Sequence, residues 1–321
     1  MRVFTGIQPS GDLHIGNYFG SIKQMVDAQQ NAETFAFIAN YHAMSSGNGG
    51  ERLAGLTMQS AIDFLALGID PERSTFWVQS DVKEVLELYW ILSAFTPMGL
   101  LERAHSYKDK TAKGIAANHS LFSYPVLMAA DILLFSPDTV PVGKDQIQHV
   151  EIARDIAIKF NNEYGEIFKL PEFKVEESVA TVPGTDGQKM SKSYKNTINI
   201  FEEEKARQKS IKKIVTQNVA LEEPKEYANC NVYNIAKLFL NEQESLELQE
   251  RYKRGGEGHG HFKLYLAEVI HEYFKPYQAK RDYYMNHLDE VREILDMGAT
   301  KAKAVAAPMM EKIQSVTGIR Y

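Results

Sequence analysis

Two segments of the chain carry residues whose types and spacing suit chemistry on a polyphosphate. Residues 9–17 read PSGDLHIGN, a glycine-containing turn that carries the imidazole of His14. Residues 189–193 read KMSKS and carry two lysines. Cationic and N–H groups relieve the repulsion that a carboxylate meets when it attacks the α-phosphate of ATP. The two segments together therefore predict nucleotide activation.

The first segment lies between a predicted strand at 2–6 and a predicted helix at 16–30. Small residues let the backbone approach a phosphate or an adenine closely, and a helix N-terminus favours an anion. We expect His14 to donate to phosphate oxygens and Gly16 to leave room for the adenosine. An ordinary strand-to-helix turn with a surface histidine would explain this segment alone equally well.

The second segment follows a flexible stretch, PGTDG at 183–187. Lys189 and Lys192 are three positions apart, so both ammonium groups could close over a triphosphate as adaptable point charges. A basic turn in solvent is the simpler alternative. The accompanying methionine and serines make that alternative less attractive.

The composition of the chain limits which classes of protein it can belong to. With 321 residues, 44% of them hydrophobic and 24% charged, the chain can form a large core and a second domain. A net charge of −6 gives no global basic field, although a local patch would suffice to bind RNA. One cysteine, Cys230, excludes a disulfide within the chain and multi-cysteine metal sites. Because no signal peptide or membrane-length apolar run is recognisable, we expect a cytoplasmic protein with no membrane partner.

The predicted elements divide the chain in two. Strands at 2–6, 34–40 and 74–78 alternate with helices at 16–30, 53–67 and 83–95. This alternation predicts an α/β fold with a doubly wound parallel sheet, and ligands would bind beyond the carboxyl ends of its strands. After about residue 195 only helices are predicted, at 201–215, 232–240, 243–252, 262–274 and 278–297. We expect these to form an α-helical second domain.

One acidic residue stands out in an apolar stretch. Met128 and Asp131 share a face of a helix that Pro125 would begin. A carboxylate in such a setting needs a partner, and an indole N–H can only donate. A fixed carboxylate beside a flat apolar slot would therefore suit the detection of an indole ring. An aspartate paired with a nearby lysine or helix end is the plainer alternative.

Segments 6–11, 124–133, 143–149 and 298–302 join the two motifs in a wider resemblance. Over nearly its whole length the chain resembles the tryptophanyl-tRNA synthetases, which are class I aminoacyl-tRNA synthetases. The resemblance implies a Rossmann-like catalytic domain at 1–194, rejoined by a C-terminal helix at about 298–321, and an anticodon-binding helical domain at 195–297. It also implies ATP with its Mg²⁺, L-tryptophan and tRNA(Trp) as ligands, and a homodimer.

The resemblance, together with the motif chemistry, assigns roles to individual residues and implies no protein ligand to a metal. Catalysis would fall to Lys189, Lys192, His14 and Lys110. ATP binding would involve Gln8, Pro9, Ser10, Gly16, Asn17, Gly143, Lys144, Asp145, Lys189, Met190, Ser191, Lys192 and Ser193. Tryptophan binding would involve Asp131, Tyr124, Met128, Gln146, Phe4, Gly6, His42, Val140 and Val142.

Some points depart from the family pattern or stay open. Lys144 stands where a glutamate is commoner, so its side-chain role is in question. Asn17 replaces the second histidine of the best-known form of the motif, as is normal in the tryptophan branch. Which residue of 179–182 contacts adenine is left open. One predicted helix carries a basic stretch, which either forms a solvated face or contacts tRNA phosphates. Its residues are Lys205, Arg207, Lys209, Lys212 and Lys213.

Three rival functions are weighed against this one. A tyrosyl-tRNA synthetase shares the fold and motifs, and the Met128–Asp131 helix disfavours it. A catalytically silent RNA-binding relative is disfavoured by the intact His14, Lys189 and Lys192. A nucleotidyltransferase that adenylates a small acid without tRNA is the third. Apolar residues in 86–95 and 98–101 would suit a dimer contact, although burial within the monomer explains them equally well.

Overall fold

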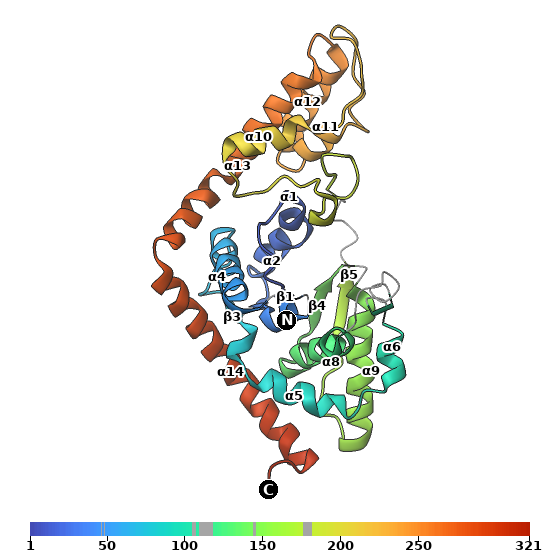
Figure 1. The fold of residues 1–321 in the computed structure, drawn as a ribbon, viewed down its shortest axis with the longest axis vertical. Helices are drawn as coiled ribbons and strands as arrows, with labels where there is room; N and C mark the ends of the chain where they lie inside the picture. Colours follow the sequence, from blue (N-terminus) through green and yellow to red (C-terminus); the bar gives the residue numbers. More distant parts are fainter. Residues whose placement is uncertain (46, 48, 105–106, 109–117, 144–145, 176–181) are drawn as a thin grey trace.

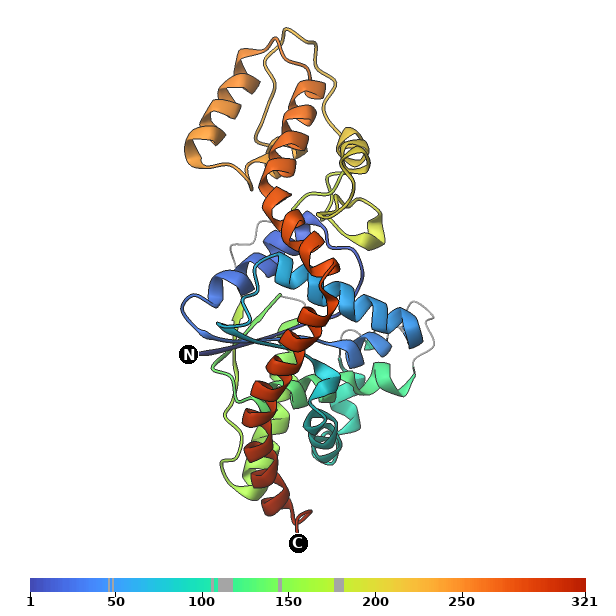
Figure 2. The same ribbon diagram turned by 90° about the vertical axis from the view of Figure 1, so that its left-hand side faces the viewer.

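The computed structural model describes residues 1–45, 47, 49–104, 107–108, 118–143, 146–175 and 182–321. The molecule is elongated, with a sheet and its flanking helices towards one end and a group of helices at the other (Figure 1). Two long helices run along one side and connect these parts (Figure 2). In the described residues, no helix is long and apolar enough to cross a membrane.

Within the described residues, parallel strands form a five-stranded sheet in the order β3-β2-β1-β4-β5. This confirms the predicted doubly wound α/β fold, although the predicted strands correspond only to β1, β2 and β3. The chain builds outward from β1 to β3 and then returns to the other side of β1, so the strand order reverses between β1 and β4. Such a reversal opens a crevice at the carboxyl ends of the strands. The strands are β1 (Arg2–Ile7), β2 (Glu33–Ile38), β3 (Ser74–Val78), β4 (Thr139–Val142) and β5 (Glu172–Val175).

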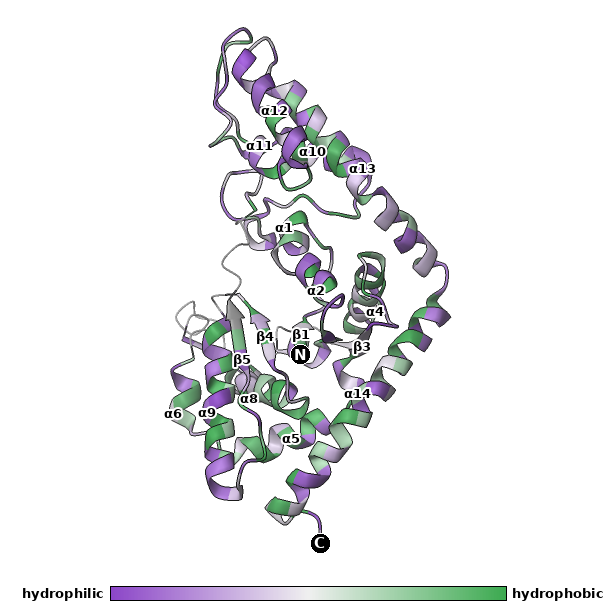
Figure 3. Ribbon diagram, turned by 180° about the vertical axis from the view of Figure 1, so that it is seen from behind, coloured by the Kyte–Doolittle hydropathy of each residue, from purple (hydrophilic) through white to green (hydrophobic). Residues whose placement is uncertain are grey.

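Alternating side chains place both faces of the sheet in hydrophobic cores. In β2, Ala36 and Ile38 join the core that includes α4, whereas Phe35 and Phe37 join the core formed with α5, α8 and α9. This two-sided burial explains the nearly continuous apolar sequence of β2. Helices such as α9 and α14 carry hydrophobic residues interspersed with hydrophilic ones (Figure 3). The helices of this part include α2 (Lys23–Ala28), α3 (Asn40–Met44), α4 (Gly50–Ala66), α5 (Glu84–Ser93), α6 (Met98–Glu102), α8 (His119–Leu134) and α9 (Ile147–Tyr164).

The later part of the chain is helical, as predicted, but one predicted break is wrong. A single helix continues through Pro276 to Met285, where separate helices at 262–274 and 278–297 were expected. Beyond the proline, Arg281 donates to the buried Asp63 of α4 at 2.6 Å, so tertiary contacts outweigh the lost backbone hydrogen bond. The helices are α10 (Glu204–Lys212), α11 (Asn231–Ala236), α12 (Glu242–Arg254), α13 (His259–Met285) and α14 (Leu288–Thr317).

Pro125 also lies inside a helix instead of starting one. Helix α8 begins at His119, and the side chain of Asn118 caps it by accepting the N–H of Leu121 at 2.8 Å. Because α8 is buried between α5 and α9, its packing tolerates the missing donor at Pro125. Met128 and Asp131 therefore still lie one turn apart on this helix.

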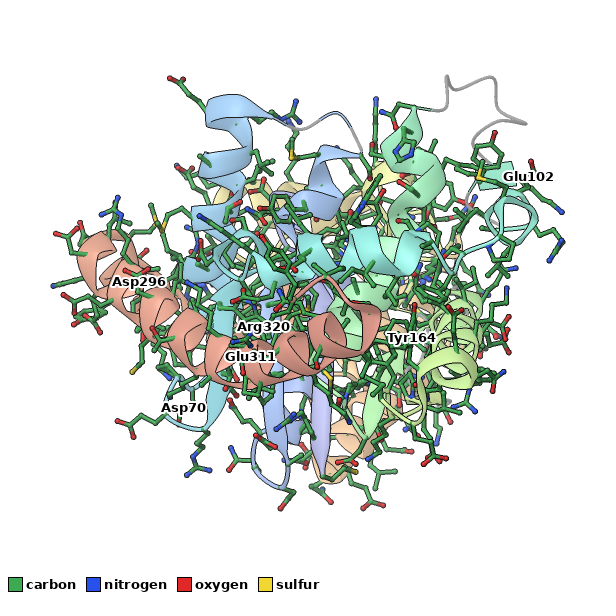
Figure 4. The ribbon with its side chains drawn as sticks, turned by 90° about the horizontal axis from the view of Figure 1, so that it is seen from below. Asp70, Glu102, Tyr164, Asp296, Glu311 and Arg320 are labelled. Atoms are coloured by element: carbon green, nitrogen blue, oxygen red, sulfur yellow. The ribbon has the colours of Figure 1, made fainter. Side chains whose placement is uncertain are left out.

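Helix α14 crosses the sheet at very close range. Seen from below, it runs across the molecule from Asp296 past Glu311, and Arg320, which follows the end of the helix, lies beside Glu311 (Figure 4). A Cβ added at Gly298 would lie 1.8 Å from the carbonyl oxygen of Phe76 in β3. Only glycine lets the helix backbone come this near to the strand.

Substituting alanine at Gly298 should force α14 away from β3. We expect Gly298→Ala to lower the free energy of unfolding by about 1–3 kcal/mol, because the methyl group meets backbone that cannot move aside. The measurement is urea unfolding followed by circular dichroism. Gly55→Ala in α4 is the matched control, since nothing lies within 4 Å of its added Cβ. That control should gain up to about 1 kcal/mol; equal effects of the two substitutions would refute the close approach.

Candidate active site

The turn after β1 is held by reciprocal hydrogen bonds around His14. The side chain of His14 caps the short helix α1 (Ile15–Asn17): its Nδ1 accepts the N–H of Asn17 at 3.2 Å. In return, the side-chain oxygen of Asn17 accepts the N–H of His14 at 3.1 Å. Gly11 adopts a φ of +83°, which glycine alone reaches without strain. The chain then continues through a π-helical turn, η1 (Tyr18–Ile22).

These contacts define the protonation state of His14. Burial and the positive charge of Lys192 lower the pKa of His14 from 6.5 to about 4, so the ring is neutral near pH 7. Because Nδ1 accepts a backbone N–H, the single ring proton lies on Nε2. His14 can therefore donate one hydrogen bond from Nε2 without carrying a charge.

The lysine-containing loop is organised by one buried amide. Asn196, which is 2% exposed, donates to the carboxylate of Asp186 at 2.7 Å and to the carbonyl of Lys189 at 3.1 Å. Its side-chain oxygen accepts the N–H of Ser191 at 2.8 Å. A Cβ at Gly184 would lie 2.2 Å from this amide, so glycine is required beside it. The amide thereby ties both ends of the loop together.

The structure brings the two motifs into contact, although they are far apart in the sequence. The Lys192 ammonium donates to the carbonyl oxygen of Ser10 at 2.9 Å and to its hydroxyl at 3.2 Å, across 182 residues. Met190 is buried, and its Cβ lies 3.3 Å from where a Cβ on Gly16 would be. Lys189 and Ser193 are exposed. The loop therefore closes over the turn, with Lys192 as the bridging group.

Carboxylates from the first turn and from α4 act on the charge of Lys192. Partial burial lowers the pKa of the Lys192 ammonium, and the carboxylates of Asp12 and Asp63 oppose this shift. Asp63 is itself buried, which raises its pKa to about 6 in spite of the adjoining Arg281. Lys192 as a whole is exposed, so an arriving polyanion could reach its ammonium beside these carboxylates.

A second cluster surrounds Asp131. Its carboxylate is 2% exposed and accepts two side-chain partners. The Nε2 of Gln79 donates to both oxygens, at 2.8 and 2.9 Å, and the Nε2 of His42 lies 2.8 Å from Oδ2. In the described contacts its partners are thus a histidine and a glutamine, and not the lysine of the plainer alternative. The His42 ring lies 6.3 Å from that of Tyr124, and the Tyr124 hydroxyl is hydrogen-bonded to Nε2 of His149.

The remaining residues expected around tryptophan differ in how far they are buried. Phe4 belongs to an aromatic core, with ring centroids 5.0 Å from Phe37 and 5.3 Å from Phe135. Gly6 is exposed although it lies in the central strand, so the carboxyl end of β1 is open. A Cβ at Gly6 would lie 2.4 Å from the ring of Phe37. Val140 is buried, whereas Met128, Tyr124, Val142 and Gln146 are partly buried.

Only some of the other residues expected to contact the nucleotide lie within the described residues. Gln8 is exposed, Pro9 is buried, and Gly143 is exposed at the end of β4. Lys110, Lys144, Asp145 and residues 179–181 lie outside the described residues. Among the described residues, no group of three histidine, cysteine, aspartate or glutamate side chains could hold a metal ion.

Two important residues of the site were not predicted from the sequence. Gln79 directly follows β3, and a polar residue just after a buried strand is a usable signal for a ligand site. Asn196 gives no such signal, because it is one of several polar residues in a loop. Its importance follows only from its burial and its contacts with three loop residues.

Comparison with known proteins agrees with this geometry. A family model for class I tRNA synthetases (W and Y) matches residues 1–275. A tryptophan–tRNA ligase from Campylobacter jejuni is 64% identical over 319 residues, covering 99% of this chain and 100% of the relative. One from Fusobacterium nucleatum is 50% identical, covering 99% of this chain and 98% of the relative.

A solved structure extends the likeness to three dimensions. The crystal structure of tryptophanyl-tRNA synthetase from Campylobacter jejuni, complexed with ADP and tryptophan, superimposes with a TM-score of 0.96. It is 64% identical in sequence and covers 99% of this chain and 100% of its own. The meeting of the two motifs, the family match and these relatives lead to one conclusion: this chain belongs to the tryptophan–tRNA ligase family of class I tRNA synthetases.

Proposed function

We propose that this chain joins L-tryptophan to tRNA(Trp) in two steps. The tryptophan carboxylate attacks the α-phosphorus of ATP, which enters as its Mg²⁺ complex; pyrophosphate leaves and tryptophanyl-adenylate forms. A hydroxyl of the terminal adenosine of tRNA then attacks the adenylate carbonyl, and AMP leaves. No protein nucleophile is needed, because the substrate carboxylate is already ionised near pH 7.

The observation that carries this proposal is the contact of Lys192 with Ser10 beside His14. In our proposal, ATP lies between the turn and the loop, and its phosphates replace Ser10 as the partner of the Lys192 ammonium. Lys189, which is exposed on the same loop, supplies a second cation, and Lys110 a third. These groups stabilise the charge that develops on the phosphates in the transition state.

His14 would act as a neutral donor in this scheme. Its Nε2–H donates to a phosphate oxygen, while Asn17 fixes the ring through Nδ1. The turn around Gln8, Pro9 and Ser10 and the residues Gly16 and Gly143 would line the nucleotide. Met190, Ser191 and Ser193 would complete the loop above it.

The cluster around Asp131 would bind the amino acid. The carboxylate accepts the indole N–H, and Met128, Val140 and Val142 surround the ring. Gln146 and Tyr124 would hold the substrate ammonium. His42 supports Asp131 directly, at 2.8 Å. Phe4 and Gly6 form the base of this pocket on β1.

Domains and partners follow from the same scheme. We propose a catalytic domain at 1–194, to which the end of the chain returns, and an anticodon-binding helical domain at 195–297. Lysines of α10 would contact tRNA phosphates, which would make binding sensitive to salt. We also propose a cytoplasmic location.

Removing the Lys192 ammonium should affect the nucleotide step selectively. We expect Lys192→Ala to reduce tryptophan-dependent ATP–pyrophosphate exchange by about 100- to 1,000-fold in kcat, as loss of one preorganised charge does. The KM for tryptophan should stay within a factor of about two, because the ammonium is not in the tryptophan cluster. Lys312→Ala, an exposed lysine of α14, is the control and should exchange normally. Full exchange by Lys192→Ala would remove this lysine from the mechanism.

The buried neutral state of His14 predicts an acid-dependent loss of stability. Its pKa is about 4 in the folded chain and 6.5 otherwise, so the unfolded state binds more protons between these values. The free energy of unfolding should therefore fall as pH drops through this window. In His14→Asn that fall should be smaller. Urea titrations at about pH 7 and about pH 5 test this; identical pH dependence in both proteins would show that His14 is not buried as a neutral ring.

Exposed apolar side chains mark a surface for the proposed homodimer. Trp90 and Leu86 of α5 are 76% and 40% exposed, and Met98 of α6 is 63% exposed. Large exposed aromatic groups are typical of interface cores. We expect Trp90→Glu to shift the chain from dimer to monomer in sedimentation velocity. Leu246→Glu on α12, also exposed, is the control; an unchanged dimer in Trp90→Glu would place the contact elsewhere.

A further inference from the structure

Gln79 is a buried amide with partners at both ends. It directly follows β3, begins the 3-10 turn η2 (Gln79–Asp81), and is 1% exposed. A buried side-chain amide is costly unless both its oxygen and its nitrogen are hydrogen-bonded. The oxygen accepts the N–H of Tyr41 at 3.0 Å, and the nitrogen donates to both oxygens of Asp131, at 2.8 and 2.9 Å.

The contact with Tyr41 fixes which end of the amide faces Asp131. A backbone N–H can only donate, so the amide oxygen must point towards Tyr41 and the NH₂ group towards the carboxylate. A reversed amide would set two donors against each other on one side and two acceptors on the other. Gln79 therefore presents only donors to Asp131, whose oxygens act as acceptors towards it.

The distribution of contacts also distinguishes the two oxygens of Asp131. Oδ2 receives Gln79 and His42, whereas Oδ1 receives only Gln79. A carboxylate has about four acceptor positions, two on each oxygen. The acceptor position left by the described contacts is on Oδ1.

We infer that Gln79 is a specificity-determining residue that acts through Asp131. It holds the carboxylate as a pure acceptor and reserves Oδ1 for the N–H of the substrate ring. This inference rests on the proposed function, because it needs tryptophan as the substrate. Gln79 is a positioning residue, and its effect should be confined to substrates that carry a ring N–H.

The test compares tryptophan with β-(benzothienyl)alanine, in which sulfur replaces the indole N–H. Amino-acid-dependent ATP–pyrophosphate exchange gives kcat/KM for each substrate with the wild-type chain and with Gln79→Met. The wild-type chain should prefer tryptophan by about 10- to 100-fold, as expected for one charge-assisted hydrogen bond. In Gln79→Met this preference should fall about tenfold, through a higher KM for tryptophan. The ratio of two substrates on one preparation does not depend on how much of the protein is folded.

Gln29→Met is the matched control. Gln29 is also a buried amide, 6% exposed, which donates to the carbonyl of Gly68 at 2.7 Å and accepts the N–H of Asp70 at 3.0 Å. Its loss should lower stability, and the preference for tryptophan should stay at the wild-type value. An equal fall in both variants would mean that Gln79 is only structural, and would overturn the inference.

The pH dependence of the preference for tryptophan in Gln79→Glu is a second measurement, which a merely structural role of Gln79 would leave unchanged. The new carboxyl group must carry a proton to donate to Asp131, so the preference for tryptophan should improve as pH falls. A preference that does not change with pH in Gln79→Glu would contradict the inference. Absence of tryptophan-dependent exchange in the wild-type chain would instead overturn the proposed function. Wild-type exchange with an unchanged preference in Gln79→Met would overturn the role of Gln79 alone.

Discussion

Parallel strands that all end at the same edge of one sheet are the constraint on which the site depends. The reversal of strand order between β1 and β4 leaves the carboxyl end of β1 open, and the exposed backbone of Gly6 marks that opening. The turn with His14 leaves β1 at this edge, and Asp131 lies nearby because Gln79, at the end of β3, reaches it. One topological feature therefore positions both the turn with His14 and the cluster around Asp131.

Buried polar groups then fix the hydrogen-bonding roles of two side chains of the site. His14 is kept neutral by burial and by Lys192, while Asp131 is held as an acceptor by the NH₂ group of Gln79. In each case a partner that can only donate, or only accept, removes the alternative proton arrangement. Asn196 likewise has a donor group facing acceptors and an acceptor facing a backbone N–H, which fixes the orientation of its amide in the lysine-containing loop. Ordinary buried amides thus order this region of the molecule alongside its charged residues.

Helix α13 links the helical part of the chain to this site. Tyr18, in the π-helical turn after the His14 motif, is hydrogen-bonded to Tyr273 and Tyr277 of α13, at 3.1 and 3.2 Å. Further along the same helix, Arg281 pairs with the buried Asp63 at 2.6 Å. A buried ion pair whose partner is removed leaves a costly isolated charge, so this contact strongly constrains the position of the helix. A movement of α13 would therefore disturb the contacts of Tyr18 near the turn and the position of Asp63 near Lys192.

The sequence by itself determined the fold class, the two motifs and the central position of Asp131. These depend on local patterns: strand and helix periodicity, a glycine turn with a histidine, and an acid in an apolar helix. Only the tertiary structure decided the continuous path of α13 through Pro276, the closure of Lys192 on Ser10, and the roles of Gln79 and Asn196. These features depend on contacts between residues that are distant in the chain. Burial changes the free-energy cost of a proline inside a helix and of an amide without partners. A local sequence pattern does not contain that information.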